Sequence, residues 1–216
     1  MKNGFTIIEL VISIFILSVA VVGIFSAFSV MVILTSDAAN QFTATYLAQE
    51  GMEIARNIRD TNWLYMNICA SGVTPLPSNV TCPASWVDGL NCGSGCEADY
   101  TTTGSVSNPV KIHTGDYLNI DADGFYSYST TGTVTPTIFK RKIIIKPIAD
   151  VNNQPDDHII KVIVQVSWDK KATILSSGVS AENCCPDPAN SNCPANVSNC
   201  VITEETLYDW YNYSGQ

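Results

Sequence analysis

The amino-terminal segment places a glycine, an aromatic residue and a carboxylate at a spacing that could do chemistry. Gly4 precedes Phe5, and Glu9 is the one acid before a long apolar run. Cleavage of the peptide bond between Gly4 and Phe5 would give Phe5 a new α-ammonium group. Glu9 would then lie four residues further on, about one helical turn away and on the same face. Its carboxylate could neutralise that ammonium group, or the ammonium group of a neighbouring copy.

The run behind Glu9 is long enough to cross a membrane. Residues 10–36 carry no charged side chain, and about 20 apolar residues span a bilayer as a helix. An acid inside such a segment is costly and points to a functional role. Two alternatives stay open. One is an ordinary signal anchor in which Glu9 has no role. The other is a cleaved secretory signal, although the apolar core of such signals is only about 7–15 residues long.

Residues 4–10 have the sequence Gly-Phe-Thr-Ile-Ile-Glu-Leu. Together with the apolar run, they resemble the processing and methylation motif of type IV pilins and type II secretion pseudopilins. The resemblance implies cleavage between Gly4 and Phe5 by a prepilin peptidase and N-methylation of Phe5. It also implies that Glu9 guides the docking of subunits in a helical filament. No proline interrupts the run, which places the chain nearer to the pseudopilins.

The helical pattern continues beyond the apolar run as an amphipathic helix. Apolar residues recur at spacings of three and four, which is typical of one buried helix face: Ala44, Leu47, Ala48, Met52, Ala55 and Ile58. Asn57, Asp60 and Asn62 indicate that the helix ends near Arg59. We therefore expect a leader at 1–4, a transmembrane and filament-core helix at 5–34, an amphipathic helix at 35–61 and an extracytoplasmic, cysteine-rich β-sheet domain at 62–216.

Eight cysteines lie beyond the apolar run, which indicates disulfides in an oxidising compartment. They are Cys69, Cys82, Cys92, Cys96, Cys184, Cys185, Cys193 and Cys200. Eight cysteines allow 105 pairings, and the sequence does not select one. The spacing forms two clusters, 69–96 and 184–200, each of which would staple a local loop if pairing stayed within it. The C-x-x-x-C spacing of Cys92 and Cys96 also allows a zinc site, but a disulfide loop is favoured and no metal is expected.

The second half of the chain has the patterns of an antiparallel sheet. Strands are expected at 110–112, 117–120, 125–129, 138–148 and 159–168, with a further one at 172–175. The alternation in 159–168 is the clearest, and its hairpin with 138–148 is expected to form the centre of the sheet. Residues 66–108 indicate a loop with short strands, 150–157 a turn, and 201–210 a sheet edge or a short helix. The predicted fold class is α+β, a long helix packed on an antiparallel sheet with disulfide-stapled loops.

Other chemistry is weakly indicated. Asp121, Asp123 and the upstream Asp116 could bind calcium, but the complete pattern of a calcium-binding loop is missing and a solvated turn is favoured. His113 and His158 are the only histidines, and no nucleophile motif accompanies them. The four tryptophans could line a ligand surface, although core packing is the commoner role. The chain is therefore not predicted to be an enzyme, and no cofactor is expected.

The formal net charge of −9 argues against binding nucleic acid through bulk charge. The prediction is a structural subunit, a minor pilin or minor pseudopilin, with its leader in the cytoplasm and its domain outside the membrane. Its expected partners are prepilin peptidase, other pilin-like subunits and the membrane itself. The subunit would later leave the membrane for a cell-surface or periplasmic filament. The alternative is a single-pass, membrane-anchored binding or adhesin domain that is not assembled into a filament.

Overall fold

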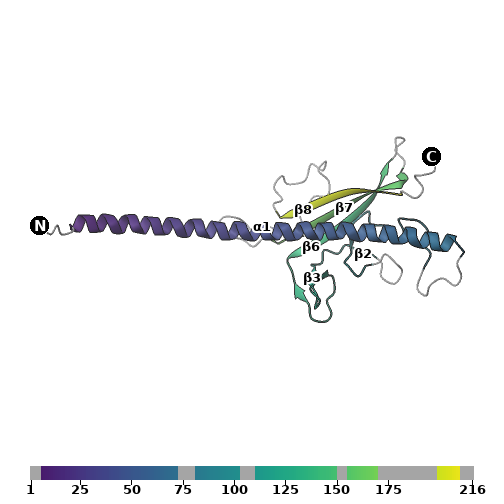
Figure 1. The fold of residues 1–216 in the computed structure, drawn as a ribbon, viewed down its shortest axis with the longest axis horizontal. Coiled ribbons are helices and arrows are strands. Elements are labelled where there is room, and N and C mark those ends of the chain that lie inside the picture. Colours follow the sequence, from purple (N-terminus) through teal and green to yellow (C-terminus); the bar gives the residue numbers. More distant parts are fainter. Residues whose placement is uncertain (1–5, 73–80, 103–109, 150–154, 170–198, 210–216) are drawn as a thin grey trace. The chain divides into compact units, whose positions relative to one another are not determined.

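The computed structural model describes residues 6–72, 81–102, 110–149, 155–169 and 199–209 of the chain (Figure 1). The chain divides into two compact units, Met1–Phe42 and Thr43–Gln216. Helix α1 (Ile7–Ala70) begins in the first unit and ends in the second. Each unit has its own surface and its own packing, and the two are described in turn.

The described part of the first unit is the beginning of α1, and its apolar side chains face outward on all sides. The large apolar residues from Ile7 to Leu34 are exposed except for the half-buried Ile33, with Ile7 at 83% and Phe25 at 70%. A helix that is apolar all round is typical of a membrane span, whereas a helix on the surface of a soluble domain has one polar face. The first unit is therefore suited to an apolar environment.

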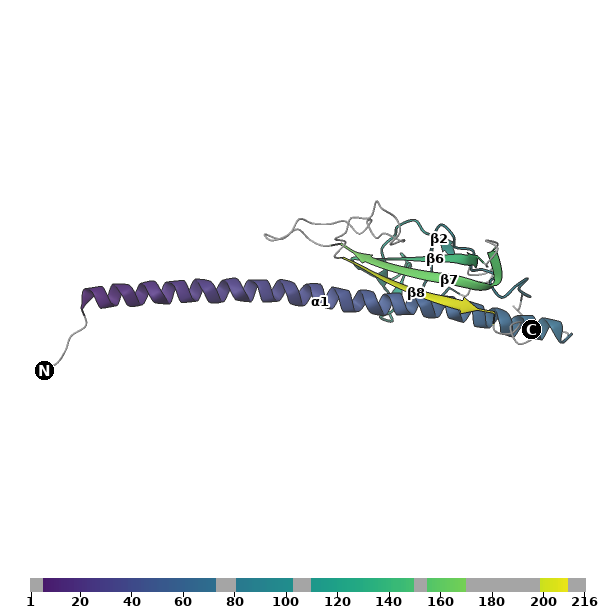
Figure 2. The same ribbon diagram turned by 90° about the horizontal axis from the view of Figure 1, so that it is seen from above.

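The second unit contains a five-stranded antiparallel sheet against which the later part of α1 packs (Figure 2). Its strands, in the order β2-β1-β6-β7-β8, are Lys111–Ile112, Cys96–Glu97, Phe139–Ala149, Pro155–Trp168 and Cys200–Tyr208. The long strands β6 and β7 are central, and β8 forms one edge. The predicted α+β class and the central hairpin are confirmed, and 201–210 proves to be a sheet edge in its described part.

The hairpin register follows the alternation seen in the sequence. Ile143 faces Val164 across the β6–β7 pair, and the even-numbered residues of β7 from Ile160 to Trp168 are all buried. The predicted turn at 150–157 is too long, because β7 already begins at Pro155. Proline lacks an N–H donor but is tolerated as the first residue of a strand. Residues 172–175, where a further strand was expected, lie outside the described residues.

A separate three-stranded sheet accompanies the main one. Its order is β4-β3-β5, with bounds Tyr126–Ser127, Asn119–Ile120 and Thr135–Pro136. The strands expected at 117–120 and 125–129 are present in shorter form, whereas β5 was not predicted. A two-residue strand that contains a proline has no alternation by which sequence could reveal it.

The helix extends further than the sequence indicated. We expected it to end near Arg59, but α1 continues to Ala70. Trp63 is buried in the core, and the side-chain amide of Asn62 donates to the backbone oxygens of Trp86 and Asp88 at 3.0 and 2.7 Å. These tertiary contacts outweigh the weak helix preference of asparagine. The beginning of the predicted 66–108 loop is therefore helical.

Small residues allow α1 to approach the sheet closely. A Cβ atom at Gly51 would lie 2.8 Å from Cγ1 of Val164 and 3.1 Å from Cδ of Arg141. Ala44, Ala48 and Ala55 on the same helix are also fully buried. The predicted apolar face of the amphipathic helix is thus confirmed as the face that packs on the sheet, and its small side chains set the distance between the two.

Arg141 joins the helix, the sheet and the chain beside β1 through one buried guanidinium group. Its side chain has no exposed surface, and Nη1 lies 3.2 Å from Oε2 of Glu50. Nη1 also donates to the backbone oxygen of Leu47 at 3.1 Å, and Nη2 donates to that of Ala98 at 2.6 Å. Because arginine stays charged in proteins, these acceptors are needed to hold it in the core.

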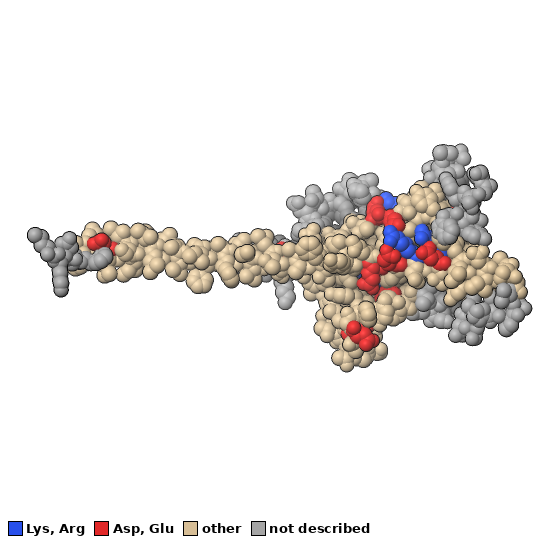
Figure 3. All heavy atoms as spheres, in the orientation of Figure 1, with Lys and Arg blue, Asp and Glu red and all other residues tan. Residues whose placement is uncertain are grey.

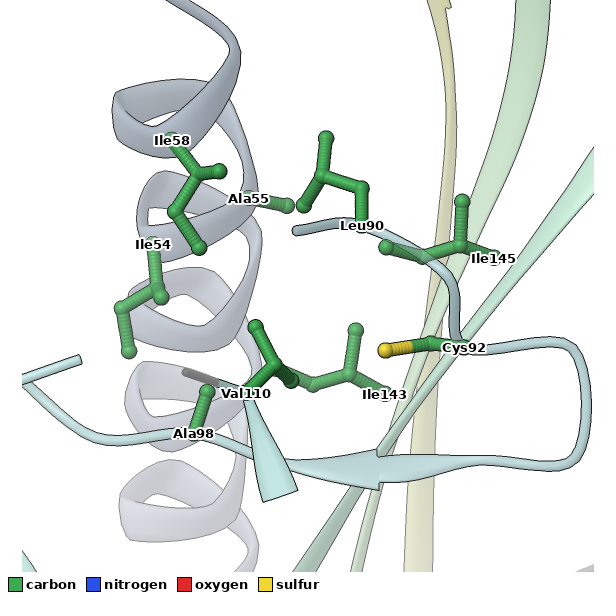
Figure 4. A pocket seen from close by; sticks show the side chains of 9 residues that line it. All are labelled: Ile54, Ala55, Ile58, Leu90, Cys92, Ala98, Val110, Ile143 and Ile145. Atoms are coloured by element: carbon green, nitrogen blue, oxygen red, sulfur yellow. The ribbon is translucent and has the colours of Figure 1, made fainter. Parts of the chain in front are cut away.

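The core between α1 and the sheet is densely filled. A small cavity of about 10 Å³ lies there, lined only by apolar side chains and Cys92 (Figure 4). Ile54, Ala55 and Ile58 of α1 close one side of it, and Ile143 and Ile145 of β6 close another. The space is the size of a single water molecule at most and offers no polar partner, so it is a packing gap and not a ligand site.

Two disulfides lie within the first cysteine cluster. Cys69 bonds to Cys82 and Cys92 bonds to Cys96. The first ties the last turn of α1 to the chain beyond it, and the second closes the tight loop that leads into β1. The disulfide interpretation of the Cys92–Cys96 spacing is thus confirmed over the zinc alternative. Cys200 is also disulfide-bonded, whereas Cys184, Cys185 and Cys193 lie outside the described residues.

Arg141→Met is expected to lower the free energy of unfolding of the second unit by about 1–3 kcal/mol, because the buried oxygen of Ala98 loses its donor. Thermal unfolding of the purified protein in detergent, followed by circular dichroism, would measure the change. Lys146→Met is the matched control on the same strand. Lys146 is exposed, so its replacement should change stability by less than about 0.5 kcal/mol. Equal effects of the two variants would contradict the role assigned to Arg141.

The two disulfides should differ in their access to reductants. Cys82 is exposed, whereas Cys92 and Cys96 are only 2% and 4% exposed. We expect mild reductant to open Cys69–Cys82 first, because thiolate attack requires access to a sulfur atom. Alkylation followed by peptide mass mapping would show the order. Earlier alkylation of Cys92 and Cys96 in the folded protein would contradict the burial described above.

Candidate functional site: the amino-terminal helix

The residues around Glu9 form the capped beginning of α1. Thr6 precedes the first helical residue, and its backbone oxygen accepts hydrogen bonds from the N–H groups of Glu9 and Leu10 at 3.1 and 3.2 Å. The N–H of Glu9 also lies 3.4 Å from Oγ1 of Thr6. Threonine at the N-cap with a glutamate three residues on is the arrangement of a capping box. The helix therefore begins at Ile7, and Glu9 lies in its first turn.

Sequence reasoning had missed Thr6. The sequence does contain the pattern that identifies Thr6 as a helix start, because Thr-x-x-Glu before an apolar run is typical of one. The capping contact uses backbone atoms of Glu9, and the carboxylate of Glu9 is exposed at the helix surface. Negative charge is favourable in the first turn of a helix because of the helix dipole. Glu9 is thus placed to interact with a group outside this helix.

Gly4 and Phe5, the two residues of the predicted cleavage site, lie outside the described residues. The structure therefore places only Glu9 of the three predicted processing and assembly residues. Their roles stay predictions.

The apolar surface behind Glu9 is continuous but not smooth. A shallow depression on the first unit is lined by Phe28, Met31, Val32, Thr35, Ser36 and Ala39. Small and bulky side chains next to one another make ridges and hollows, which are the features that let helices pack side by side in apolar surroundings. Within the described residues, α1 is the one helix long and apolar enough to cross a membrane.

The histidines form separate pairs with acids. Nδ1 of His113 lies 3.0 Å from Oε1 of Glu97, and Nδ1 of His158 lies 3.5 Å from Oδ2 of Asp209. Burial lowers the pKa of His113, and the nearby Glu97 offsets this only in part. The carboxylate of Glu97 also accepts backbone N–H groups from residues 114–116. The Glu97 pair therefore fixes the chain after β2.

The acidic turn considered for calcium is held by hydrogen bonds of its own. Oδ1 of Asp121 accepts the N–H groups of Asp123 and Phe125, both at 3.0 Å. Oδ2 of Asp121 accepts the hydroxyl of Tyr100 at 2.7 Å. The geometry supports the turn interpretation. Over the described part of the chain, no group of three or more histidines, cysteines or acids is arranged to hold a metal ion.

Three of the four tryptophans belong to the core. Trp63, Trp86 and Trp168 are 6% exposed or less, and the rings of Trp63 and Trp86 stack with centroids 6.1 Å apart. The packing interpretation is confirmed for these three, and Trp210 lies outside the described residues. None of the three is exposed enough to form a ligand surface.

Several charged side chains of the second unit are paired with one another. Arg56 of α1 bridges Glu53 on the same helix and Glu205 on β8, and Lys161 of β7 pairs with Glu204 of β8. Figure 3 shows acidic and basic groups intermingled over this part of the surface. The beginning of α1 has no comparable charge cluster, and Glu9 is the one charged residue among residues 6–36.

Comparison with known proteins finds one match. Residues 1–25 match the family model of the prokaryotic N-terminal methylation motif, which is the signature of type IV pilins and pseudopilins. No curated protein and no solved structure matches the chain. The matched segment contains Gly4, Phe5 and Glu9, so the resemblance inferred from these residues is confirmed as a match to the motif.

The match supports a pilin-like precursor that prepilin peptidase processes. Such a precursor has a membrane-embedded amino-terminal helix, which agrees with the exposed apolar surface of the first unit. Together the motif and the helix support a membrane-anchored protein. Proteins with this motif are structural and not enzymatic.

Proposed function

We propose that the protein is a structural subunit, a minor pilin or minor pseudopilin, of a type IV pilus-like or type II secretion filament. Prepilin peptidase cleaves between Gly4 and Phe5, and the new amino group is methylated. The leader lies in the cytoplasm and the second unit outside the membrane. The subunit then leaves the membrane, and its helix at 5–34 becomes part of the filament core.

The observation that carries this proposal is a carboxylate at the start of an otherwise uncharged, exposed apolar helix. Glu9 is exposed, and the apolar side chains that follow it have no covering within the first unit. In a bilayer or a helical bundle an unpaired carboxylate costs several kcal/mol. The α-ammonium group that processing would create on Phe5 of a neighbouring subunit has the charge to pair with it.

The role of Glu9 predicts a specific defect. Glu9→Ala should leave membrane insertion and cleavage intact but reduce incorporation into filaments by at least about tenfold, since removing one partner of a buried ion pair costs roughly 3–5 kcal/mol. Immunoblotting of sheared filament and membrane fractions would measure incorporation. Glu53→Ala is the matched control, because Glu53 is an exposed acid of the same helix in the second unit. Normal incorporation of Glu9→Ala would refute the assigned role.

Processing itself can be tested by intact-mass and amino-terminal peptide analysis of the protein from its native membrane. The expected chain begins at Phe5 and carries one added methyl group. A chain that begins at Met1 would overturn the filament proposal in favour of the alternative, a single-pass, membrane-anchored binding domain. A chain that begins near Ala39 would show that the apolar helix is removed, and filament assembly through it would be ruled out.

A further inference from the structure

Two aromatic side chains lie side by side on the surface of the second unit, away from its core. Tyr100 follows β1 and is 48% exposed, and Phe125 precedes β4 and is 56% exposed. Their ring centroids are 5.1 Å apart, with the planes inclined by 40°. Neither ring belongs to the buried core of the unit. Exposed apolar groups that gather in this way mark interaction sites more often than isolated ones do.

The position of these two rings is fixed by the turn at residues 121–125. The backbone N–H of Asp121 donates to the backbone oxygen of Phe125 at 2.9 Å. The backbone N–H of Gly124 donates to the backbone oxygen of Asp121 at 3.1 Å. Gly124 adopts a φ of 88°, which suits glycine. The hydroxyl of Tyr100 is held by Asp121 as described above. A rigid aromatic surface loses little conformational entropy when it binds a partner.

The surroundings of the rings are acidic. The hydrogen bond from Tyr100 lowers the pKa of Asp121, so this carboxyl group is ionised at neutral pH. The same hydrogen bond, together with Asp123 and Asp99 nearby, raises the pKa of Tyr100. Among the described ion pairs, neither Asp121 nor Asp123 has a lysine or arginine partner.

The acids of this turn differ in this respect from the paired acids of α1 and β8. Figure 3 shows an acidic group over the small sheet without basic atoms beside it, whereas the acids over α1 and β8 are interleaved with basic groups. Among the described residues, the two carboxylates therefore have no basic partner beside the two exposed aromatic faces. Both features attract a cation, one through its charge and the other through the ring quadrupole.

We propose that Tyr100, Phe125, Asp121 and Asp123 form an acidic aromatic patch that binds an arginine side chain of a partner protein. The guanidinium plane stacks on the exposed ring of Phe125, and its N–H groups donate to the free carboxylate of Asp123. Arginine fits better than lysine, because its planar, weakly hydrated cation can stack and donate at the same time. The partner is a basic protein and not a second copy, since this chain carries a net charge of −9.

This inference goes beyond filament assembly and does not depend on it. The patch lies wholly in the second unit, and a membrane-anchored domain outside any filament would display it equally. Failure of the Glu9 experiment would leave the patch intact, and failure of the binding experiment would leave the filament proposal intact.

The test uses the full-length protein in nonionic detergent and a fluorescently labelled hexa-arginine peptide, with binding followed by fluorescence anisotropy at about 0.15 M salt. Phe125→Leu keeps an apolar side chain but removes the ring, and Asp123→Asn removes one charge. Each variant should weaken binding about two- to fivefold, the range expected for an exposed cation–π contact or ion pair. A hexa-lysine peptide should bind the unaltered protein more weakly than hexa-arginine does.

The controls separate the patch from bulk charge. Tyr208→Leu removes another exposed aromatic residue, and Asp60→Asn removes another exposed acid, so both should leave the affinity unchanged. The proposal is overturned if the unaltered protein does not bind the peptide, if Phe125→Leu and Asp123→Asn bind as tightly as it does, or if Asp60→Asn weakens binding equally. Displacement of the peptide by a neutral oligosaccharide would also overturn it, because the patch would then be a sugar site.

Discussion

The uncovered apolar surface of α1 in the first unit is the constraint on which the rest of the protein depends. Burial of a large apolar side chain stabilises a protein by about 1.5–3 kcal/mol relative to exposure to water. This stretch of helix exposes many such side chains. The helix therefore requires a bilayer or neighbouring helices around it. In either environment an isolated carboxylate is unfavourable, so a cationic partner would stabilise Glu9. The proposed filament supplies both the apolar neighbours and the cation.

The second unit satisfies its own requirements internally. The later part of α1 buries one face against the sheet, and Arg141 finds its acceptors on the helix and beside β1. The Cys69–Cys82 bond ties the last turn of α1 to the chain beyond it, and the Cys92–Cys96 bond closes the loop that leads into β1. The described core of this unit is thus filled by side chains of the unit itself.

The proposed Glu9 ion pair and the proposed contact at the acidic aromatic patch differ in strength and in salt dependence. Pairing of Glu9 would occur where water is excluded, so it would be strong and little affected by salt. Contact with the acidic aromatic patch would occur at an exposed surface, where screening limits each charge to a modest contribution. The first suits permanent assembly, and the second suits reversible binding of a partner that approaches the exposed surface.

The sequence by itself determined the apolar amino-terminal helix, the position of Glu9, the amphipathic continuation, the central hairpin and the α+β class, because each follows from local spacing or periodicity. Tertiary structure alone decided the extension of α1 to Ala70, where Trp63 and Asn62 gain contacts with residues distant in the chain. It also decided the pairing of Cys69 with Cys82 and the meeting of Tyr100 with Phe125. These features depend on how separate segments pack together, and no local pattern encodes that.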